Sequence, residues 1–90
     1  MEIRYLQSFL QVAKDGNFTK AADRLGYSQG TVTVQIKQLE KEIGAPLFQR
    51  IGNKSILTSA GEKLIEYANQ MLLINDNIKN LASSNPILIK

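Results

Sequence analysis

An amphipathic stretch in the middle of the chain, residues 28–43, constrains the fold most strongly. Its apolar residues recur at the three- and four-residue spacing that brings side chains onto one face of an α-helix. They are Val32, Ile36, Leu39 and Ile43. Ser28 fits the N-cap of this helix, and Gly44 fits the glycine that commonly follows a helix end. The sequence therefore predicts a helix that buries one face against other elements.

The face opposite this apolar stripe is polar and nearly free of acidic residues. A rotation of about 100° per residue places on it Gly30, Val34, Lys37, Gln38 and Lys41, with Thr31 and Thr33 at its margins. Val34 is the exception, because it is apolar on a face that should meet water. Isolated apolar residues are common on protein surfaces, which is the simplest explanation. The alternative is a partner that offers both hydrogen-bonding edges and methyl groups, as the major groove of DNA does.

The composition excludes several classes of site. The chain has 90 residues with no cysteine and no histidine. Zinc fingers, disulfide scaffolds and Cys or His catalytic arrangements are therefore excluded, and we expect no enzyme, no metal and no cofactor. No apolar run approaches the roughly 20 residues of a membrane span, and the first residues do not resemble a signal peptide. We expect a cytoplasmic protein that makes no membrane contact.

The charge is biased toward the N-terminal part. The net charge is +3, and residues 1–56 carry eight Lys or Arg against five Asp or Glu, whereas residues 57–90 carry three of each. A basic excess of this size suits a polyanionic partner without requiring one.

Two further helices are predicted before residue 28. The first runs from about Ile3 to Lys14, and Thr19 fits the N-cap of a short second helix from Lys20 to Leu25. A short helix, a turn with glycine and a longer helix with a polar outer face are typical of the helix-turn-helix, whose second helix enters the major groove. A plain helical hairpin inside another three-helix bundle is the alternative.

A β-hairpin is predicted next. The β-prone runs 47–51 and 55–58 flank Gly52-Asn53-Lys54, which can form a tight turn. The hairpin carries Arg50 near its base and Lys54 at its tip. In a winged helix-turn-helix, such a wing lies along the phosphate backbone or touches the minor groove. A solvated charged turn is the alternative for Lys54.

The last predicted helix starts at a capping box formed by Ser59 and Glu62 and runs to about Ala82. Its apolar residues alternate at spacings of three and four and form a seam: Leu64, Tyr67, Met71, Ile74, Ile78 and Leu81. No other long helix is predicted that could cover the seam, so we expect it to pair with the same helix of a second copy. The alternative is that the seam folds back on the first helix.

Taken in order, these features resemble the DNA-binding domain of LysR-type transcriptional regulators. The resemblance rests on Gly16 to Leu25, Ser28-Gln29, Val32 to Glu40, Pro46 to Arg50 and Leu57 to Gly61. It implies a mainly α fold, with a winged helix-turn-helix (a three-helix core plus a two-stranded wing) over residues 1–58 and a long linker or dimerisation helix over 59–84. Residues 85–90 would begin a missing effector-binding domain, which would hold any small-molecule effector.

The resemblance also assigns residues to an interface with double-stranded DNA. The residues expected to read bases are Gln29, Gly30, Thr31, Thr33, Val34 and Gln35. Those expected to contact phosphates, directly or from the wing, are Thr19, Lys20, Ser28, Lys37, Arg50 and Lys54. The family usually has proline or another residue at the position of Gly30 and a basic residue at that of Val34. An apolar side chain at Val34 makes a thymine methyl group its more natural partner.

The expected function is therefore sequence-specific DNA binding. A homodimer joined through the last helix, or a tetramer in a longer parent protein, would read an interrupted inverted repeat. Residues 28–43 would enter the major groove, and the wing, residues 47–58, would lie near the minor groove. The alternative is a winged-helix module that binds protein and dimerises without touching nucleic acid.

Overall fold

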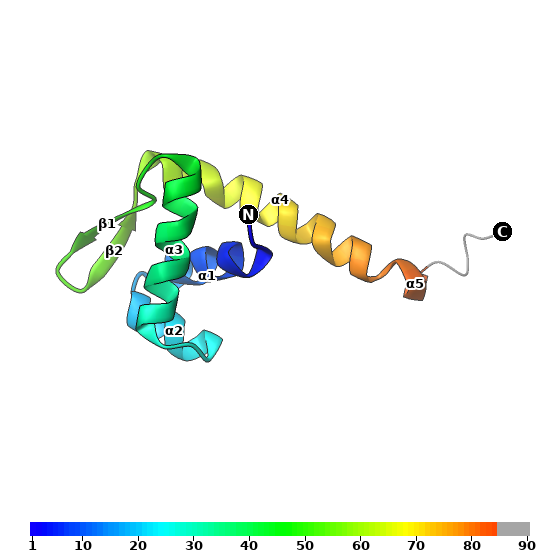
Figure 1. Cartoon of the computed structure of the whole chain (residues 1–90), viewed down its shortest axis with the longest axis horizontal. Coiled ribbons are helices and arrows are strands. Elements are labelled where there is room, and N and C mark those ends of the chain that lie inside the picture. The colour runs from blue at the N-terminus through cyan, green and yellow to red at the C-terminus, as the bar shows by residue number, and fades with distance from the viewer. Residues whose placement is uncertain (85–90) are drawn as a thin grey trace.

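The structure is a computed structural model that describes residues 1–84. These residues form α1 (Ile3–Asp15), α2 (Phe18–Leu25), α3 (Gln29–Ile43), β1 (Phe48–Ile51), β2 (Lys54–Leu57), α4 (Ser59–Lys79) and α5 (Leu81–Ser84). The hairpin β1–β2 and the distal part of α4 extend in opposite directions from the first three helices (Figure 1). The predicted winged helix-turn-helix with a long following helix is confirmed. The predicted start of a further domain at 85–90 lies outside the described residues.

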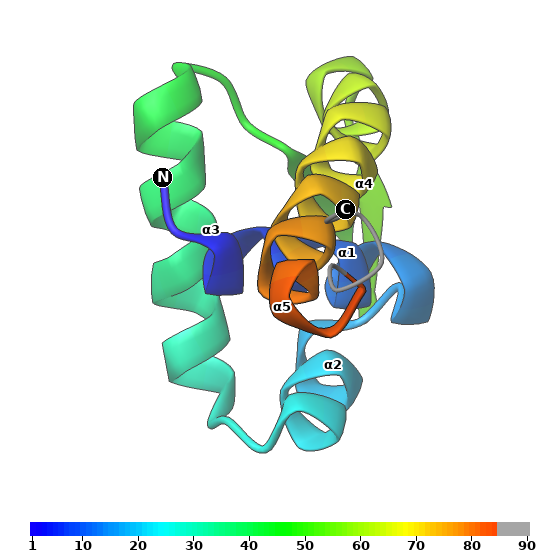
Figure 2. The same cartoon turned by 90° about the vertical axis from the view of Figure 1, so that its right-hand side faces the viewer.

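The core lies where α1 meets the other helices and the first strand. It contains Leu6, Phe9, Val12, Phe18, Ala21, Ala22, Val32, Ile36, Leu39, Leu47, Phe48 and Ala68. Three members of the predicted stripe of α3 are therefore buried, whereas Ile43 is 39% exposed because it lies in the last turn, beyond the neighbouring helices. Helix α1 lies between α3 and α4 (Figure 2), so the outer face of α3 points away from the rest of the domain.

Two of the predicted helix starts are wrong by one or two residues. Helix α2 begins at Phe18, and its N-cap is Asn17, whose Oδ1 accepts a hydrogen bond from the Lys20 N–H at 2.9 Å. Phe18 belongs to the buried core, so the helix must start early enough to turn its ring inward. Thr19, predicted as the cap, is an exposed residue of the first turn.

Helix α4 also begins differently from the prediction. Its N-cap is Thr58 rather than Ser59, because the Thr58 hydroxyl makes two bonds that hold the chain there. The hydroxyl oxygen accepts from the Gly61 N–H at 3.1 Å, and the hydroxyl donates to the Pro46 carbonyl at 2.6 Å. The helix ends at Lys79 rather than near Ala82, and the short helix α5 follows.

The wing is a two-stranded antiparallel hairpin in the register Phe48↔Leu57 to Ile51↔Lys54. This register leaves a two-residue turn of Gly52 and Asn53, so Lys54 is the first residue of β2 rather than part of the turn. Gly52 has a φ of +61°, a conformation that a tight hairpin needs and that glycine adopts without strain.

Hydrogen bonds hold the wing against the helices at both ends. At the tip, Asn17 Nδ2 donates to the Asn53 carbonyl at 2.9 Å, and the Ser55 N–H donates to the Gly16 carbonyl at 2.9 Å. At the base, the Leu47 N–H donates to Glu40 Oε2 at 2.8 Å. These contacts set the position of the wing beside α3. No helix within residues 1–84 is long and apolar enough to cross a membrane.

Candidate nucleic-acid interface

The N-terminal half of α3 presents most of the predicted base-reading residues to solvent. Gln29, Gly30, Thr31 and Val34 are exposed, and Thr33 is half-buried at the margin. Val34 is 64% exposed, as its position on the outer face predicted. Ser28 caps the helix, because its Oγ accepts a hydrogen bond from the Thr31 N–H at 3.1 Å. The side of α3 that faces away from the domain can therefore approach another surface directly.

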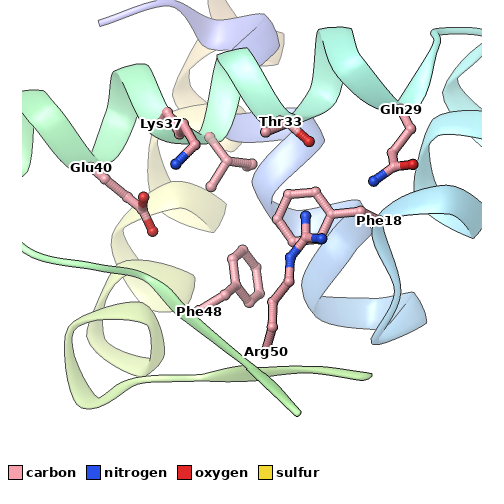
Figure 3. A pocket seen from close by; sticks show the side chains of 8 residues that line it. Phe18, Gln29, Thr33, Lys37, Glu40, Phe48 and Arg50 are labelled. Atoms are coloured by element: carbon pink, nitrogen blue, oxygen red, sulfur yellow. The ribbon is translucent and has the colours of Figure 1, made fainter. Parts of the chain in front are cut away.

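A groove of about 470 Å³ runs between α3 and the wing (Figure 3). Its lining residues come from α2, α3 and β1: Phe18, Gln29, Thr33, Ile36, Lys37, Glu40, Phe48 and Arg50. The cations Lys37 and Arg50 border it from opposite walls. Within residues 1–84, the only carboxylate in this lining is that of Glu40, which already accepts a hydrogen bond from the Leu47 N–H. The groove therefore offers two cations to an anionic group.

Arg50 is held in place by an aromatic contact that was not predicted from the sequence. Its guanidinium carbon lies 4.1 Å from the centroid of the Phe18 ring, and Figure 3 shows the guanidinium over that ring. Phe18 is in turn packed edge-on against Phe48, with ring centroids 5.6 Å apart. A cation over an aromatic face is attracted by the ring quadrupole. Phe18 thereby orients the Arg50 guanidinium toward the groove.

Of the predicted phosphate-contacting residues, Lys37 and Arg50 line this groove. Thr19 and Gln29 line a smaller hollow with Arg50 and the turn of the wing, about 180 Å³ in volume. Lys20 is exposed in the first turn of α2, and Lys54 is exposed next to the wing turn. The structure thus brings residues from α2, α3 and both strands to the same side of the molecule.

A second groove, of about 640 Å³, lies on the other side of the outer face of α3. It is lined by Arg4, Tyr5, Tyr27, Ser28, Gly30, Thr31, Val34 and Gln35. Arg4, Tyr5 and Tyr27 were not predicted from the sequence. No local signal identifies Arg4 and Tyr5, because they belong to α1 and reach this side only through the crossing of α1 and α3.

Gln35, which was predicted to read bases, is largely buried in the structure. It is only 7% exposed, and its Oε1 accepts a hydrogen bond from the hydroxyl of Ser8, which is fully buried. Gln35 lies about 100° around the helix from Val34, at a margin where the packing of α1 decides which side is inside. Its amide oxygen therefore bonds within the domain, and we leave Gln35 out of the residues that read bases.

The comparisons with known proteins identify the family. Residues 3–62 match the family model of bacterial regulatory helix-turn-helix proteins of the lysR family. The chain belongs to the LysR family. It is 44% identical over 79 residues to the uncharacterized HTH-type transcriptional regulator YwqM of Bacillus subtilis (strain 168), covering 88% of this chain and 27% of that protein. It is 47% identical over 76 residues to the HTH-type transcriptional regulator BudR of Klebsiella aerogenes, covering 84% and 53%.

Solved structures of LysR-family domains have the same fold. The DNA-binding domain of CbnR in a complex with DNA matches with a TM-score of 0.88 and 34% identity, covering 93% of this chain and 97% of that chain. The BenM domain bound to benA site 1 DNA matches with a TM-score of 0.85 and 33% identity, covering 93% and 98%. The chain spans about a quarter to a half of the length of the two curated relatives, both named as regulators rather than enzymes.

The α4 helix of this LysR-family domain carries an apolar surface that the described residues leave largely open. On α4, Tyr67, Met71, Ile74 and Ile78 are 40–61% exposed. Leu81, which was predicted to continue the seam on the same helix, lies in α5 and is 61% exposed. Leu64, predicted as the first residue of the seam, is half-buried against the core of its own domain. The first turn of α1 only borders the seam, where Ile3 lines a hollow with Met71, Ile74, Asn75 and Ile78.

Proposed function

We propose that the chain is the sequence-specific DNA-binding domain of a LysR-type transcriptional regulator in the cytoplasm. Helix α3 would enter the major groove and the wing would lie near the minor groove. The observation that carries the proposal is the position of Lys37 and Arg50 on opposite walls of the groove beside the exposed turns of α3. Similarity to two domains solved with DNA supports it and does not favour the protein-binding alternative.

The proposal divides the interface into two sets of residues. Those that read base edges are Gln29, Gly30, Thr31, Thr33 and Val34. Those that contact phosphates are Thr19, Lys20, Ser28, Lys37, Arg50 and Lys54. The Gln29 amide can form a bidentate contact with adenine, which is worth about 1–3 kcal/mol of discrimination against another base. The phosphate contacts carry no sequence information and set affinity and register.

The test is selection of bound duplexes from a random pool, followed by titration of the recovered sequence and a scrambled duplex at several salt concentrations. DNA binding predicts a recovered consensus and an affinity that falls steeply as salt rises, because each phosphate contact releases counterions. Absence of binding to any duplex, even at low salt, would refute the proposal and favour a module that binds only protein.

We also propose that two copies pair through the exposed seam of α4. An open stripe of large apolar side chains on a long helix is costly in water, and a second copy of the helix supplies a matching surface. The pair would place two α3 helices on successive parts of one duplex, as an inverted repeat requires.

Replacing Met71 and Ile78 together by lysine tests the seam, because both side chains would lie in the paired surface. The double variant should sediment as a monomer in analytical ultracentrifugation. Asn69→Lys with Leu73→Lys adds the same two charges to exposed positions off the seam and should leave the dimer intact. Equal masses for the two double variants would contradict pairing through the seam.

A further inference from the structure

The second groove beside α3 contains an open notch above Gly30. A Cβ atom built on Gly30 would meet only Ser28 Oγ, at 3.9 Å. The absence of a side chain at Gly30 therefore leaves empty space on the outer face rather than relieving a clash inside the protein. One helical turn further along, the isopropyl group of Val34 is 64% exposed beside this space.

The groove around the notch has apolar and polar lining residues, the polar ones being Ser28, Thr31 and Gln35, and it has one cation. Val34 and the half-buried rings of Tyr5 and Tyr27 line the groove, and Arg4 is the only charged residue in its lining. The Arg4 guanidinium lies 3.6 Å from the Glu2 carboxylate, but both side chains are largely exposed, and such a pair is weak enough to exchange for another anion. The groove suits a small apolar group carried by a polyanion.

The major-groove edges of DNA carry one group of that kind, the C5 methyl of thymine. Apart from ring C–H groups, the other groups on these edges are hydrogen-bond donors and acceptors, which a valine side chain cannot satisfy. The proposal that α3 enters the major groove brings Gly30 and Val34 against these edges, and this inference rests on that proposed function.

We propose that Gly30 and Val34 form a notch that reads the C5 methyl group of a pyrimidine and selects thymine over cytosine at one position of each half-site. Gly30 supplies the space, Val34 makes the apolar contact, and Tyr27 closes the side of the notch. Because the contact is to the methyl group alone, 5-methylcytosine also fits, and uracil does not fill it.

The test uses the duplex recovered by selection, with each thymine replaced in turn by deoxyuridine. This replacement removes only the methyl group and keeps the O4 acceptor. One thymine in each half-site should show about a fourfold loss of affinity, and changing both half-sites should cost about fifteenfold. At the same position, 5-methylcytosine should bind about fourfold more tightly than cytosine.

Variants of the protein identify the contacting side chain. Val34→Ala should abolish the difference between thymine and uracil, and Val34→Thr, which keeps the shape but adds a hydroxyl, should reduce it. Gln38→Ala, exposed on α3 outside this groove, should leave the ratio unchanged. Thermal melting of each variant shows that the fold is retained, since these positions are exposed.

The failure of this inference is distinguishable from failure of DNA binding. If the duplex binds but no thymine responds to uracil, or if 5-methylcytosine and cytosine bind alike, the notch does not read a methyl group. If the thymine preference persists in full in Val34→Ala, Val34 does not make the contact. If no duplex binds at all, the proposed function fails and this inference fails with it.

Discussion

Gly61 in the first turn of α4 is the position where the structure tolerates a side chain least. A Cβ atom built there would overlap the Leu47 carbonyl oxygen and lie 2.8 Å from Leu57 Cδ2. The Leu47 carbonyl cannot swing aside freely, because it accepts the Thr58 N–H at 3.0 Å and so closes the base of the wing. Gly61→Ala must therefore displace backbone at the junction of β1, β2 and α4.

The magnitude follows from comparison with Gly30, which also lies in the first turn of a helix. Forcing an extra methyl group into a packed site typically costs about 1–3 kcal/mol. Replacing glycine by alanine in a helix gains up to about 1 kcal/mol, and this gain applies to both positions. At Gly30 the added Cβ meets only Ser28 Oγ at 3.9 Å, so no clash offsets the gain. The difference between Gly61→Ala and Gly30→Ala therefore isolates the overpacking cost.

Thermal unfolding followed by circular dichroism measures this difference, with both variants at the same protomer concentration because a dimer gains stability with concentration. A difference of about 2 kcal/mol corresponds to about 8–16 °C in melting temperature for a domain of this size. We expect Gly30→Ala to melt at or above the parent temperature and Gly61→Ala well below it. Equal melting temperatures for the two variants would refute the reasoning, since they would mean that the junction yields without cost.

Three other predictions follow from the contacts of single side chains. Gln35→Ala should lower the free energy of unfolding by about 1–3 kcal/mol, because it leaves the buried Ser8 hydroxyl without its acceptor. It should leave the base preference of the domain unchanged. An altered base preference in a variant of unchanged stability would contradict the burial of Gln35. Asn17→Ala should lower the free energy of unfolding in urea denaturation by about 1 kcal/mol or more, because it removes both the α2 cap and the bond to the Asn53 carbonyl, whereas Thr19→Ala should cost much less; equal costs would contradict Asn17 as the cap. Lys54→Ala should weaken binding to the selected duplex and to the scrambled duplex alike. It should also reduce the slope of log affinity against log salt concentration by about one, and an unchanged slope would exclude a phosphate contact.

Much of the fold follows from local pattern in the sequence. The spacing of Val32, Ile36 and Leu39 predicted a helix with one buried face, and those residues are buried. Ser28 and Gly44 were predicted as its boundaries and are its N-cap and C-cap. Local patterns succeed here because helix periodicity and capping involve residues only a few positions apart, so their physical cause lies within the same stretch of chain.

The caps of α2 and α4 were predicted less well, because distant packing selects among neighbouring polar residues. Both Asn17 and Thr19 can cap a helix, but the burial of Phe18 favours the earlier start. In the same way, Thr58 rather than Ser59 caps α4, since only Thr58 also bonds to the Pro46 carbonyl. Local propensity limits such a choice to a few residues, and tertiary contacts make it.

The outer face of α3 and the groove beside it also depend partly on local sequence pattern and partly on tertiary contacts. The sequence by itself determined that α3 has a polar outer face that bears Gly30 and Val34, because helix geometry fixes which residues share a face. The open space at Gly30 comes from the structure. Only the tertiary structure decided that Gln35 turns inward to Ser8, since the crossing of α1 makes that margin of α3 interior. The tertiary structure also decided that Arg50 stacks on Phe18. These two residues lie far apart in the chain, so the packing of whole elements brings them together and no local preference can predict the contact.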